Sequence, residues 1–386
     1  MAAGSSLSAV SYGFARFAYG LLEPAMRADL DLTAGLSGAI AAGSYVGYCV
    51  AIVLSMLLTP TLGPRWTATA AGILATAGMA LVAVAPNAVL LAAGVLVAGS
   101  STGAASPPLA AAVAARVREP RRDRAQTAVN AGTGLGVLVS GPIALAVGAD
   151  WRAAWTVFAV TAALVTVWLH RTLAGPRPAA AASGDEGGGR DGGRPRIVPR
   201  RAPGSGRLLV SAFALGAVSV VTWTFGRQLV ESAGGMSPAG SAWLWIVLGA
   251  SGVLGAAGGD LTARVGTGPL WRILLAMMSA ATALLAVGPG GAAAYAAAAL
   301  FGATYIALTG LVLVGASRVW PDQVGAGVAV GFLAIALGQA CAAPALGALA
   351  GTTGLAGAFG VAAGVGAAAC LIGIPDRQPA PAQRFT

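Results

Sequence analysis

Ionisable side chains inside long apolar segments are the residues of this chain with the clearest chemical potential. They are Arg16 and Glu23 in the first apolar segment and Arg227 and Glu231 in the seventh. An unpaired charge costs about 3 kcal/mol or more at the centre of a bilayer, so charged groups in such segments are usually paired or line a solute or ion pathway. We therefore treat these four as the first candidates for solute binding and proton coupling.

A polar stripe runs along one face of the first apolar segment. Its members are Tyr12, Arg16, Tyr19 and Glu23. In an α-helix they fall within an arc of about 60°, because steps of three and four residues return to the same face. Lipid would not tolerate this face, so we predict that it lines an internal cavity. Arg16 would hold an anionic solute there, and the alternative is that Arg16 pairs permanently with an acid.

Glu23 and Arg227 are related by their spacing to two predicted helix caps. Glu23 precedes Thr33 by ten residues, and Arg227 precedes Ser237 by ten. If the two halves of the chain are duplicated, the two positions are pseudo-equivalent and oppose each other near the outer mouth of the cavity. We predict a gate that opens when Glu23 is protonated, with Glu231 competing for Arg227. The alternative is a static salt bridge.

Neutral side chains in other segments are weaker candidates for contact with the solute. Trp223 and Tyr305 would stack on a flat solute, and Asn130 and Gln339 would hydrogen-bond to it. The sequence has no His/Cys metal cluster, no nucleotide-binding Gly-Lys-Ser loop and no acid-rich pair inside an apolar segment. We therefore predict no metal, no cofactor and no enzyme activity.

Twelve apolar stretches must position these residues. Hydrophobic residues make up 57% of the chain and charged residues 9%, against about 25% charged in an ordinary soluble domain. A helix needs about 20 residues to cross a bilayer. The predicted spans are 7–29, 35–58, 66–85, 88–115, 125–148, 152–172, 208–232, 238–260, 269–288, 291–317, 324–347 and 352–374. The chain is thus predicted to be an all-α integral membrane protein.

The arginines predict the orientation. All 23 Lys+Arg residues are Arg; 19 of them lie in alternate breaks or in the C-terminal tail, and only Arg27 and Arg152 lie in the opposite breaks. Cationic loops stay on the cytoplasmic side during insertion, so both termini are predicted to be cytoplasmic. The net charge of +10 is explained by this topology and by anionic lipid, with no need for nucleic acid.

The predicted spans divide six and six around one polar stretch. We predict an N-terminal six-helix bundle at 1–172, a disordered cytoplasmic linker at 173–207, a C-terminal six-helix bundle at 208–374 and a cytoplasmic tail at 375–386. A basic turn containing glycine follows the second span of each half, at 63–65 and at 264–266. Duplicated six-span halves are the layout of secondary transporters, with the solute site between the halves.

Two segments carry a resemblance to a known family. The run from Gly13 to Leu30 reads GFARFAYGLLEPAMRADL and resembles the opening helix of the bacterial YbfB-like branch of the major facilitator superfamily. The glycine-rich run from Gly132 through Gly136 to Gly141-Pro142 is similar to the fifth-span motif of that superfamily. This resemblance implies two pseudo-symmetric six-helix bundles, and it implies proton-linked export more often than import.

The cytoplasmic turns depart from the superfamily pattern. In the first turn only Gly63 and Arg65 match, because Met56 and Pro60 occupy the places of a glycine and an aspartate. The matching residues of the second turn are Gly259, Arg264 and Gly266, with Ala263 at the acidic place and Asp260 nearby. We therefore predict that other contacts hold the cytoplasmic gate.

These observations predict a monomeric secondary transporter in a bacterial cytoplasmic membrane. The favoured function is proton-coupled export of a small, partly apolar organic compound by alternating access. Import of an organic anion anchored by Arg16 and Arg227 is the alternative. A membrane receptor or accessory protein without flux is the second alternative. The span-five motif favours export, and the basic residues in the predicted cavity favour the anion.

Overall fold

The computed structural model describes residues 1–118, 121–173, 199 and 201–375, and within these ranges every regular element is a helix. The first half contains α1 (Ala2–Ser8), η1 (Ala9–Phe17), α2 (Ala18–Asp29), α3 (Ala34–Ala83), α4 (Ala88–Arg116), α5 (Arg122–Val147) and α6 (Trp151–Thr172). The second contains α7 (Ser205–Ser232), α8 (Pro238–Val253), η3 (Leu254–Ala257), α9 (Gly258–Val265), α10 (Thr267–Val287), α11 (Gly291–Val319), η4 (Pro321–Gln323) and α12 (Val324–Ala369).

The helices have the length and composition of membrane spans. In the described part of the chain, eight are long and apolar enough to cross a bilayer: α3 to α7 and α10 to α12. The prediction of a helical multi-pass membrane protein is confirmed. The count of twelve spans stays a prediction, as do the bundle boundaries; most of the predicted linker and of the tail lies outside the described residues.

Glycines interrupt the two longest helices. Gly63 in α3 has φ 81° and ψ 160°, and Gly354 in α12 has φ 77° and ψ 167°. A residue with a side chain rarely adopts such positive φ values, whereas glycine does so at little cost. Each interruption falls at or near a predicted break between spans, so α3 and α12 each consist of two helical pieces.

The first and eighth predicted spans were wrong as single α-helices. Residues 9–17, which include Arg16, form the π-helix η1 between α1 and α2. The eighth span is broken by the 3-10 turn η3 between α8 and α9. Hydrophobic periodicity does not reveal such a change, because one wider or tighter turn leaves the apolar composition unchanged. π-Helical turns are often found at functional sites.

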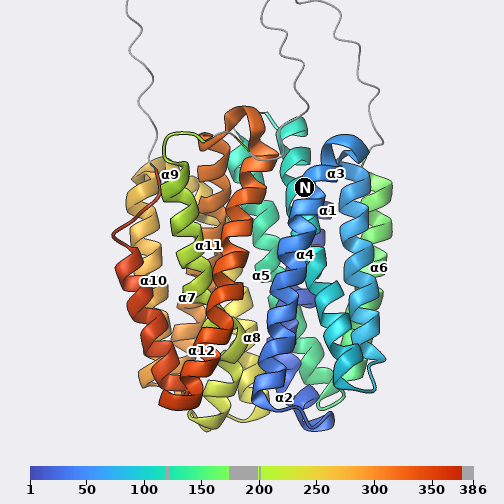
Figure 1. Ribbon diagram of the computed structural model, residues 1–386, viewed down its shortest axis with the longest axis vertical. Coiled ribbons are helices and arrows are strands. Elements are labelled where there is room, and N and C mark those ends of the chain that lie inside the picture. Colours follow the sequence, from blue (N-terminus) through green and yellow to red (C-terminus); the bar gives the residue numbers. More distant parts are fainter. Residues whose placement is uncertain (119–120, 174–198, 200, 376–386) are drawn as a thin grey trace, which may run out of the picture.

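The two halves of the chain lie side by side. Figure 1 shows α1 to α6 on one side and α7 to α12 on the other. Glycine allows close contact between them: a Cβ on Gly249 of α8 would lie 2.2 Å from the backbone nitrogen of Leu138 in α5. Within the first half, a Cβ on Gly136 of α5 would lie 2.2 Å from the carbonyl oxygen of Ala9 in η1. Small residues let membrane helices approach closely, and these glycines occupy such contacts.

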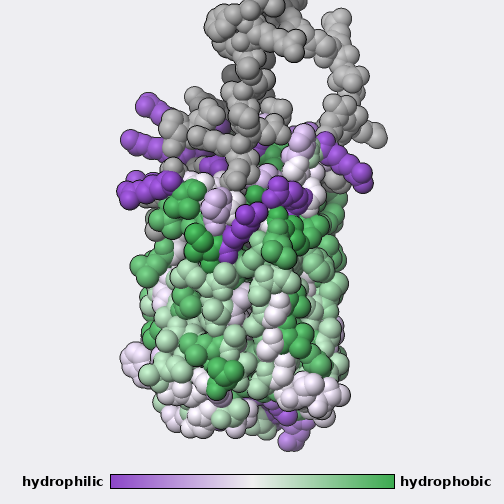
Figure 2. Space-filling model, turned by 90° about the vertical axis from the view of Figure 1, so that its left-hand side faces the viewer, coloured by the Kyte–Doolittle hydropathy of each residue, from purple (hydrophilic) through white to green (hydrophobic). Residues whose placement is uncertain are grey.

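Charge is unevenly distributed between the two ends of the molecule. Figure 2 shows hydrophilic side chains gathered at the end that carries the N-terminus in Figure 1, above an apolar middle. Exposed arginines near helix ends there include Arg116, Arg171, Arg207, Arg264 and Arg272. At the opposite end, Arg152 at the start of α6 forms an ion pair of 2.6 Å with Asp29. The arginines from which the orientation was predicted thus lie at one end of the molecule, and the orientation itself stays a prediction.

The orientation leads to a direct test. A phosphatase or fluorescent reporter placed in the 173–207 linker or after Pro375 is expected to report cytoplasm. Reporters at Pro86 and Gly148, in two loops of the opposite end, are expected to report the outside, and the second serves as a control for the first. Reversed signals at either pair of positions would contradict the inside–inside orientation.

Candidate functional site

Arg16 is a buried cation at the contact between the two halves. Its side chain projects from η1, and the residue is only 6% exposed. The guanidinium Nη2 donates a hydrogen bond to Oε1 of Gln339 on α12. Its Nε has no hydrogen-bond partner, and no carboxylate lies within 4.0 Å of the guanidinium, in the part of the chain that the structure describes. The acid considered as a permanent partner for Arg16 is therefore not among the described residues.

Four aromatic rings surround the guanidinium. Its central carbon lies 6.0 Å from the ring centroid of Tyr12, 5.2 Å from Phe17, 5.0 Å from Tyr45 and 4.8 Å from Tyr48. Cations at these distances are attracted to the negative faces of aromatic rings, more strongly where water is excluded. The rings thus offset part of the burial cost of the charge, while its hydrogen-bonding capacity is only partly used.

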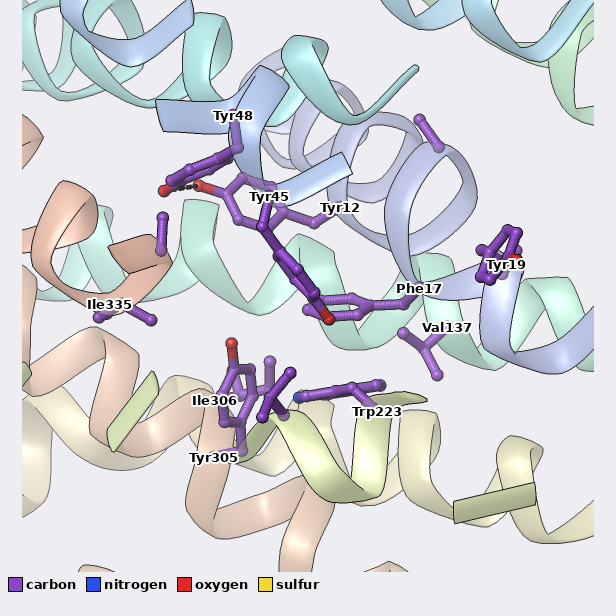
Figure 3. Packing of buried hydrophobic residues seen from close by; sticks show 14 of the residues in the cluster. Tyr12, Phe17, Tyr19, Tyr45, Tyr48, Val137, Trp223, Tyr305, Ile306 and Ile335 are labelled. Atoms are coloured by element: carbon purple, nitrogen blue, oxygen red, sulfur yellow. Dashed lines mark hydrogen bonds between the residues drawn. The ribbon is translucent and has the colours of Figure 1, made fainter. Parts of the chain in front are cut away.

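The rings of Tyr12 and Tyr48 are themselves fixed by hydrogen bonds. The Tyr12 hydroxyl lies 3.3 Å from that of Tyr48 and 2.5 Å from Oγ of Ser106 on α4. Figure 3 shows Tyr12, Tyr45 and Tyr48 grouped on one side of the contact and Trp223 and Tyr305 on the other. Two of the four rings around Arg16 are thus held by hydrogen bonds to each other and to α4.

An aromatic cluster of the second half packs against Phe17. The ring of Trp223 on α7 stacks on Phe17 with centroids 3.8 Å apart, and Tyr305 on α11 meets both rings edge-on (Figure 3). Trp223 and Tyr305 therefore lie beside the Arg16 site, where a solute-binding role would require them. In this conformation they contact protein rings.

The two amides predicted as hydrogen-bond candidates also join the halves. Asn130 on α5 donates through Nδ2 to the carbonyl of Ile306 at 3.2 Å and to Oγ1 of Thr309 at 2.9 Å, both on α11. Gln339 bonds to Arg16, and its Nε2 lies 3.5 Å from Oγ of Ser219 on α7. Both amides are buried, so their side chains form part of the closed contact around Arg16.

Little free space remains around Arg16. A cavity of about 10 Å³ lies among Arg16, Asn130 and Tyr305, and one of about 20 Å³ lies among Arg16, Tyr19 and Trp223. A cavity needs about 10–15 Å³ to hold one water. Neither space admits an organic solute, so Arg16 is closely packed by the described residues around it.

A larger cavity opens at the end opposite the arginine-rich one. Its volume is about 690 Å³, and its polar lining includes Glu23, Arg27, Asp31, Gln228 and Glu231. Glu23 and Glu231 come from the two halves of the chain. Of the residues predicted for the outer mouth, Glu23 and Glu231 line this cavity, whereas Arg227 is not among its lining residues.

The predicted ion pair between Glu23 and Arg227 is not formed in this conformation. Oε1 of Glu23 accepts a hydrogen bond of 2.6 Å from Oγ of Ser37, which also lies 3.1 Å from the Tyr19 hydroxyl. Arg227 pairs through Nε with Glu231 at 2.7 Å. Glu23 and Arg227 are therefore each bound to a group of their own half of the chain.

The local geometry nevertheless repeats between the halves. Thr33 and Ser237 both cap helices, accepting hydrogen bonds from the backbone nitrogens of residues three positions on. Ser37, four residues after the first cap, binds Glu23, and Ser241, four residues after the second, lies 3.0 Å from Nε of Arg227. Glu23 and Arg227, each ten residues before a cap, therefore make similar serine contacts in the two halves.

The motif residues at the arginine-rich end show the same repetition. Gly266 has φ 88° and ψ 159°, close to the values at Gly63. Arg65 is half-buried with its guanidinium 6.0 Å from the Trp66 ring, whereas Arg264 is exposed. The backbone of Gly259 and Asp260 belongs to α9, but the side chain of Asp260 lies outside the described part. In the fifth-span motif, a Cβ on Gly141, which precedes Pro142, would lie 2.3 Å from Ile246 of α8.

Sequence reasoning missed Ser37, Tyr45 and Tyr48 of α3. A usable signal existed: Ser37 and Tyr48 are eleven residues apart, which is about three helical turns, so they share a face. Tyr45 lies three residues before Tyr48, and one face of this segment therefore carries polar and aromatic groups that meet the first predicted span. The missing information was which face of this helix meets the first span.

Comparisons with known proteins agree with this architecture. The family model described as Major Facilitator Superfamily matches residues 5–334 of the chain. A search of curated proteins finds no match.

Solved structures with this arrangement include three transporters of low sequence identity. The human organic anion transporter MFSD10 superposes with a TM-score of 0.72 and 16% identity, covering 96% of this chain and 97% of its own. The xylose transporter XylE from E. coli superposes with a TM-score of 0.73 and 14% identity, covering 95% of this chain and 96% of its own. A point mutant of the nucleoside transporter NupG superposes with a TM-score of 0.69 and 12% identity, covering 96% of this chain and 98% of its own. At these identities the likeness shows the fold.

Proposed function

This chain belongs to the major facilitator superfamily, and from that premise we propose that it is a secondary transporter of a small organic anion. The anion has a carboxylate, which Arg16 binds, and a partly apolar body, which the surrounding rings contact. Twelve spans in two bundles, at 1–172 and 208–374, with cytoplasmic termini and linker, would provide alternating access in the cytoplasmic membrane. Proton-coupled export of a small, partly apolar organic compound, the function predicted first, is kept as the second candidate.

One observation carries the preference for an anion. Arg16 is buried between the halves, its hydrogen bond goes to a neutral amide, and its Nε has no partner among the residues that the structure describes. Arginine matches a carboxylate through two parallel hydrogen bonds, and charge-assisted bonds are about twice as strong as neutral ones. A carboxylate would satisfy both the charge and the unused donor. The named anion transporter among the structural neighbours shares the fold at 16% identity, so the proposal rests on Arg16.

Coupling to protons is assigned to the mouth carboxylates. Glu23 and Glu231 line the same cavity from the two halves, and Arg227 contacts one of them. Protonation would change which acid holds Arg227 and so the opening of the mouth. The fifth-span glycines favour export in exchange for protons, with the anion leaving through this mouth.

A thermal-shift comparison tests the anion site. Benzoate and hexanoate are expected to raise the melting temperature of the purified protein, whereas benzamide and hexanamide, which have the same shape without the charge, should leave it unchanged. A ligand at 100 times its Kd stabilises the bound state by about 2.7 kcal/mol, so a shift of several degrees is expected. The carboxylates should then accumulate in proteoliposomes under an imposed pH gradient. Equal shifts from acids and amides, or no shift from any carboxylate, would contradict the proposal.

A further inference from the structure

The hydrogen bond between Arg16 and Gln339 joins a buried cation of one half of the chain to a neutral amide of the other half. Arg16 belongs to the first half and Gln339 to α12 in the second half, so this bond closes the centre of the molecule. We propose that Gln339 is an internal stand-in for the solute, whose side-chain carbonyl occupies the place of one carboxylate oxygen while the transporter is empty. This inference rests on the proposed anion site.

The hydrogen-bond donors of Arg16 indicate that Gln339 binds Arg16 more weakly than a carboxylate would. Arginine has donors only, so the atom of Gln339 that it contacts must be the carbonyl oxygen. The amide satisfies Nη2, while the adjacent Nε of the fork has no partner among the described residues. A carboxylate offers two oxygens in the fork geometry and a full negative charge. It would therefore displace the single neutral oxygen of Gln339.

The surroundings of Gln339 give it a second bond on its own half. Gln339 is fully buried, and its Nε2 lies 3.5 Å from Oγ of Ser219 on α7. α12 and α7 both belong to the second half, so this bond is independent of the contact between the halves. When a solute takes Arg16, Gln339 can withdraw without losing every partner.

The stand-in has a consequence for the transport cycle. An empty site with an uncompensated Arg16 could not close, because a buried charge without hydrogen bonds is strongly unfavourable. Gln339 supplies an acceptor in place of the solute, and the two neighbouring cavities of about 10 Å³ and 20 Å³ leave no room for an organic solute beside this contact. The empty carrier can therefore change orientation, and net transport does not require a counter-solute.

Two variants of Gln339 change this balance in opposite directions. Gln339→Glu places a permanent carboxylate beside Arg16 and should raise the melting temperature of the empty protein while eliminating the benzoate shift. Gln339→Ala removes the competitor and should lower the melting temperature of the empty protein but tighten benzoate binding about tenfold, which corresponds to 1.4 kcal/mol. Ser219→Ala, which removes only the weaker partner of Gln339, is the matched control and should change the affinity by less than about twofold.

Transport assays separate the stand-in from an ordinary binding residue. Proteoliposomes with Gln339→Ala are expected to lose benzoate uptake into empty vesicles but to keep exchange with benzoate inside. If Gln339 instead contacts the solute directly, Gln339→Ala should weaken benzoate binding and reduce both modes together. That result would overturn the inference and leave the anion site intact.

The empty-protein measurement distinguishes a failure of this inference from a failure of the proposed function. If no carboxylate shifts the wild-type protein but Gln339→Glu still raises its melting temperature, the contact with Arg16 is right and the anion substrate is wrong. If carboxylates shift the wild type but Gln339→Glu neither stabilises the empty protein nor blocks the shift, the stand-in is wrong and the anion site stands.

Discussion

Replacing Arg16 with lysine is expected to weaken carboxylate binding by about 10- to 150-fold while the protein is still produced and folded. Lysine keeps the positive charge but loses the planar fork that can hold a carboxylate at two points. A hydrogen bond to a charged group contributes about 1.5–3 kcal/mol, and each 1.4 kcal/mol is a factor of ten in affinity. Benzoate titrations followed by thermal shift, together with concentration-dependent uptake in proteoliposomes, measure this loss.

The control for this substitution is Arg152→Lys. Arg152 lies at a mouth-side helix end in an exposed ion pair with Asp29, and such pairs contribute only about 0–1 kcal/mol. Its benzoate affinity should match the wild type. If Arg16→Lys transports as well as Arg152→Lys, and Arg16→Ala fails only because it does not fold, then Arg16 has a structural role and the anion site is wrong.

The sequence predicted the participants of this site better than their contacts. Arg16, Gln339, Trp223 and Tyr305 were all candidates because polar and aromatic groups in apolar segments are rarely without a partner. The bond between Arg16 and Gln339 joins residues 323 positions apart. Periodicity within a helix says which residues share its face, but it does not say which helix that face meets. The pairing therefore required the structure.

Local deviations from the α-helix were also beyond the sequence pattern. The stripe from Tyr12 to Glu23 was predicted for a regular helix, yet η1 places Arg16 in a π-helical turn. Tyr12 and Arg16 contact the central site, while Tyr19 and Glu23 contact Ser37 on α3. The stripe thus divides between the centre and the mouth. A wider turn changes the direction of later side chains without altering which residues are apolar.

The mouth residues show what duplication can and cannot predict. Equal spacing from Thr33 and Ser237 predicted the equivalence of Glu23 and Arg227, and each contacts a serine at the matching place of the next helix. Their pairing across the mouth depends on conformation, which spacing does not encode. In this structure Arg227 holds Glu231 beside a cavity of about 690 Å³. We expect closure of the mouth to transfer Arg227 from Glu231 to Glu23.

Single substitutions of the two acids should therefore shift the mouth in opposite directions. Glu23→Gln removes the acceptor of the closed state, so the mouth should stay open, net transport should lose its pH dependence and solute exchange should persist. Glu231→Gln frees Arg227 for Glu23 and should favour the closed mouth. A cysteine at Ala28, which lines the cavity, reports the difference through its labelling rate with a membrane-impermeant maleimide in a background lacking Cys49, Cys341 and Cys370.

The double-mutant cycle of Glu23→Gln and Arg227→Ala then tests the pair itself. Arg227→Ala alone leaves Glu23 without its closing partner and Glu231 without its ion pair, so it should impair transport more than the double variant does. Residues that interact give coupling energies of about 0.5–3 kcal/mol, whereas independent ones add. In the wild type, protonation of Glu23 should open the mouth and speed labelling at position 28, and Glu23→Gln should be fast at every pH. The cavity also carries Arg27 and Asp31, so Asp31→Asn is the control and should leave the pH response in place. Additive losses, with a pH response that follows Asp31 or Glu231, would show that Glu23 and Arg227 never pair and that the proton is carried elsewhere at the mouth.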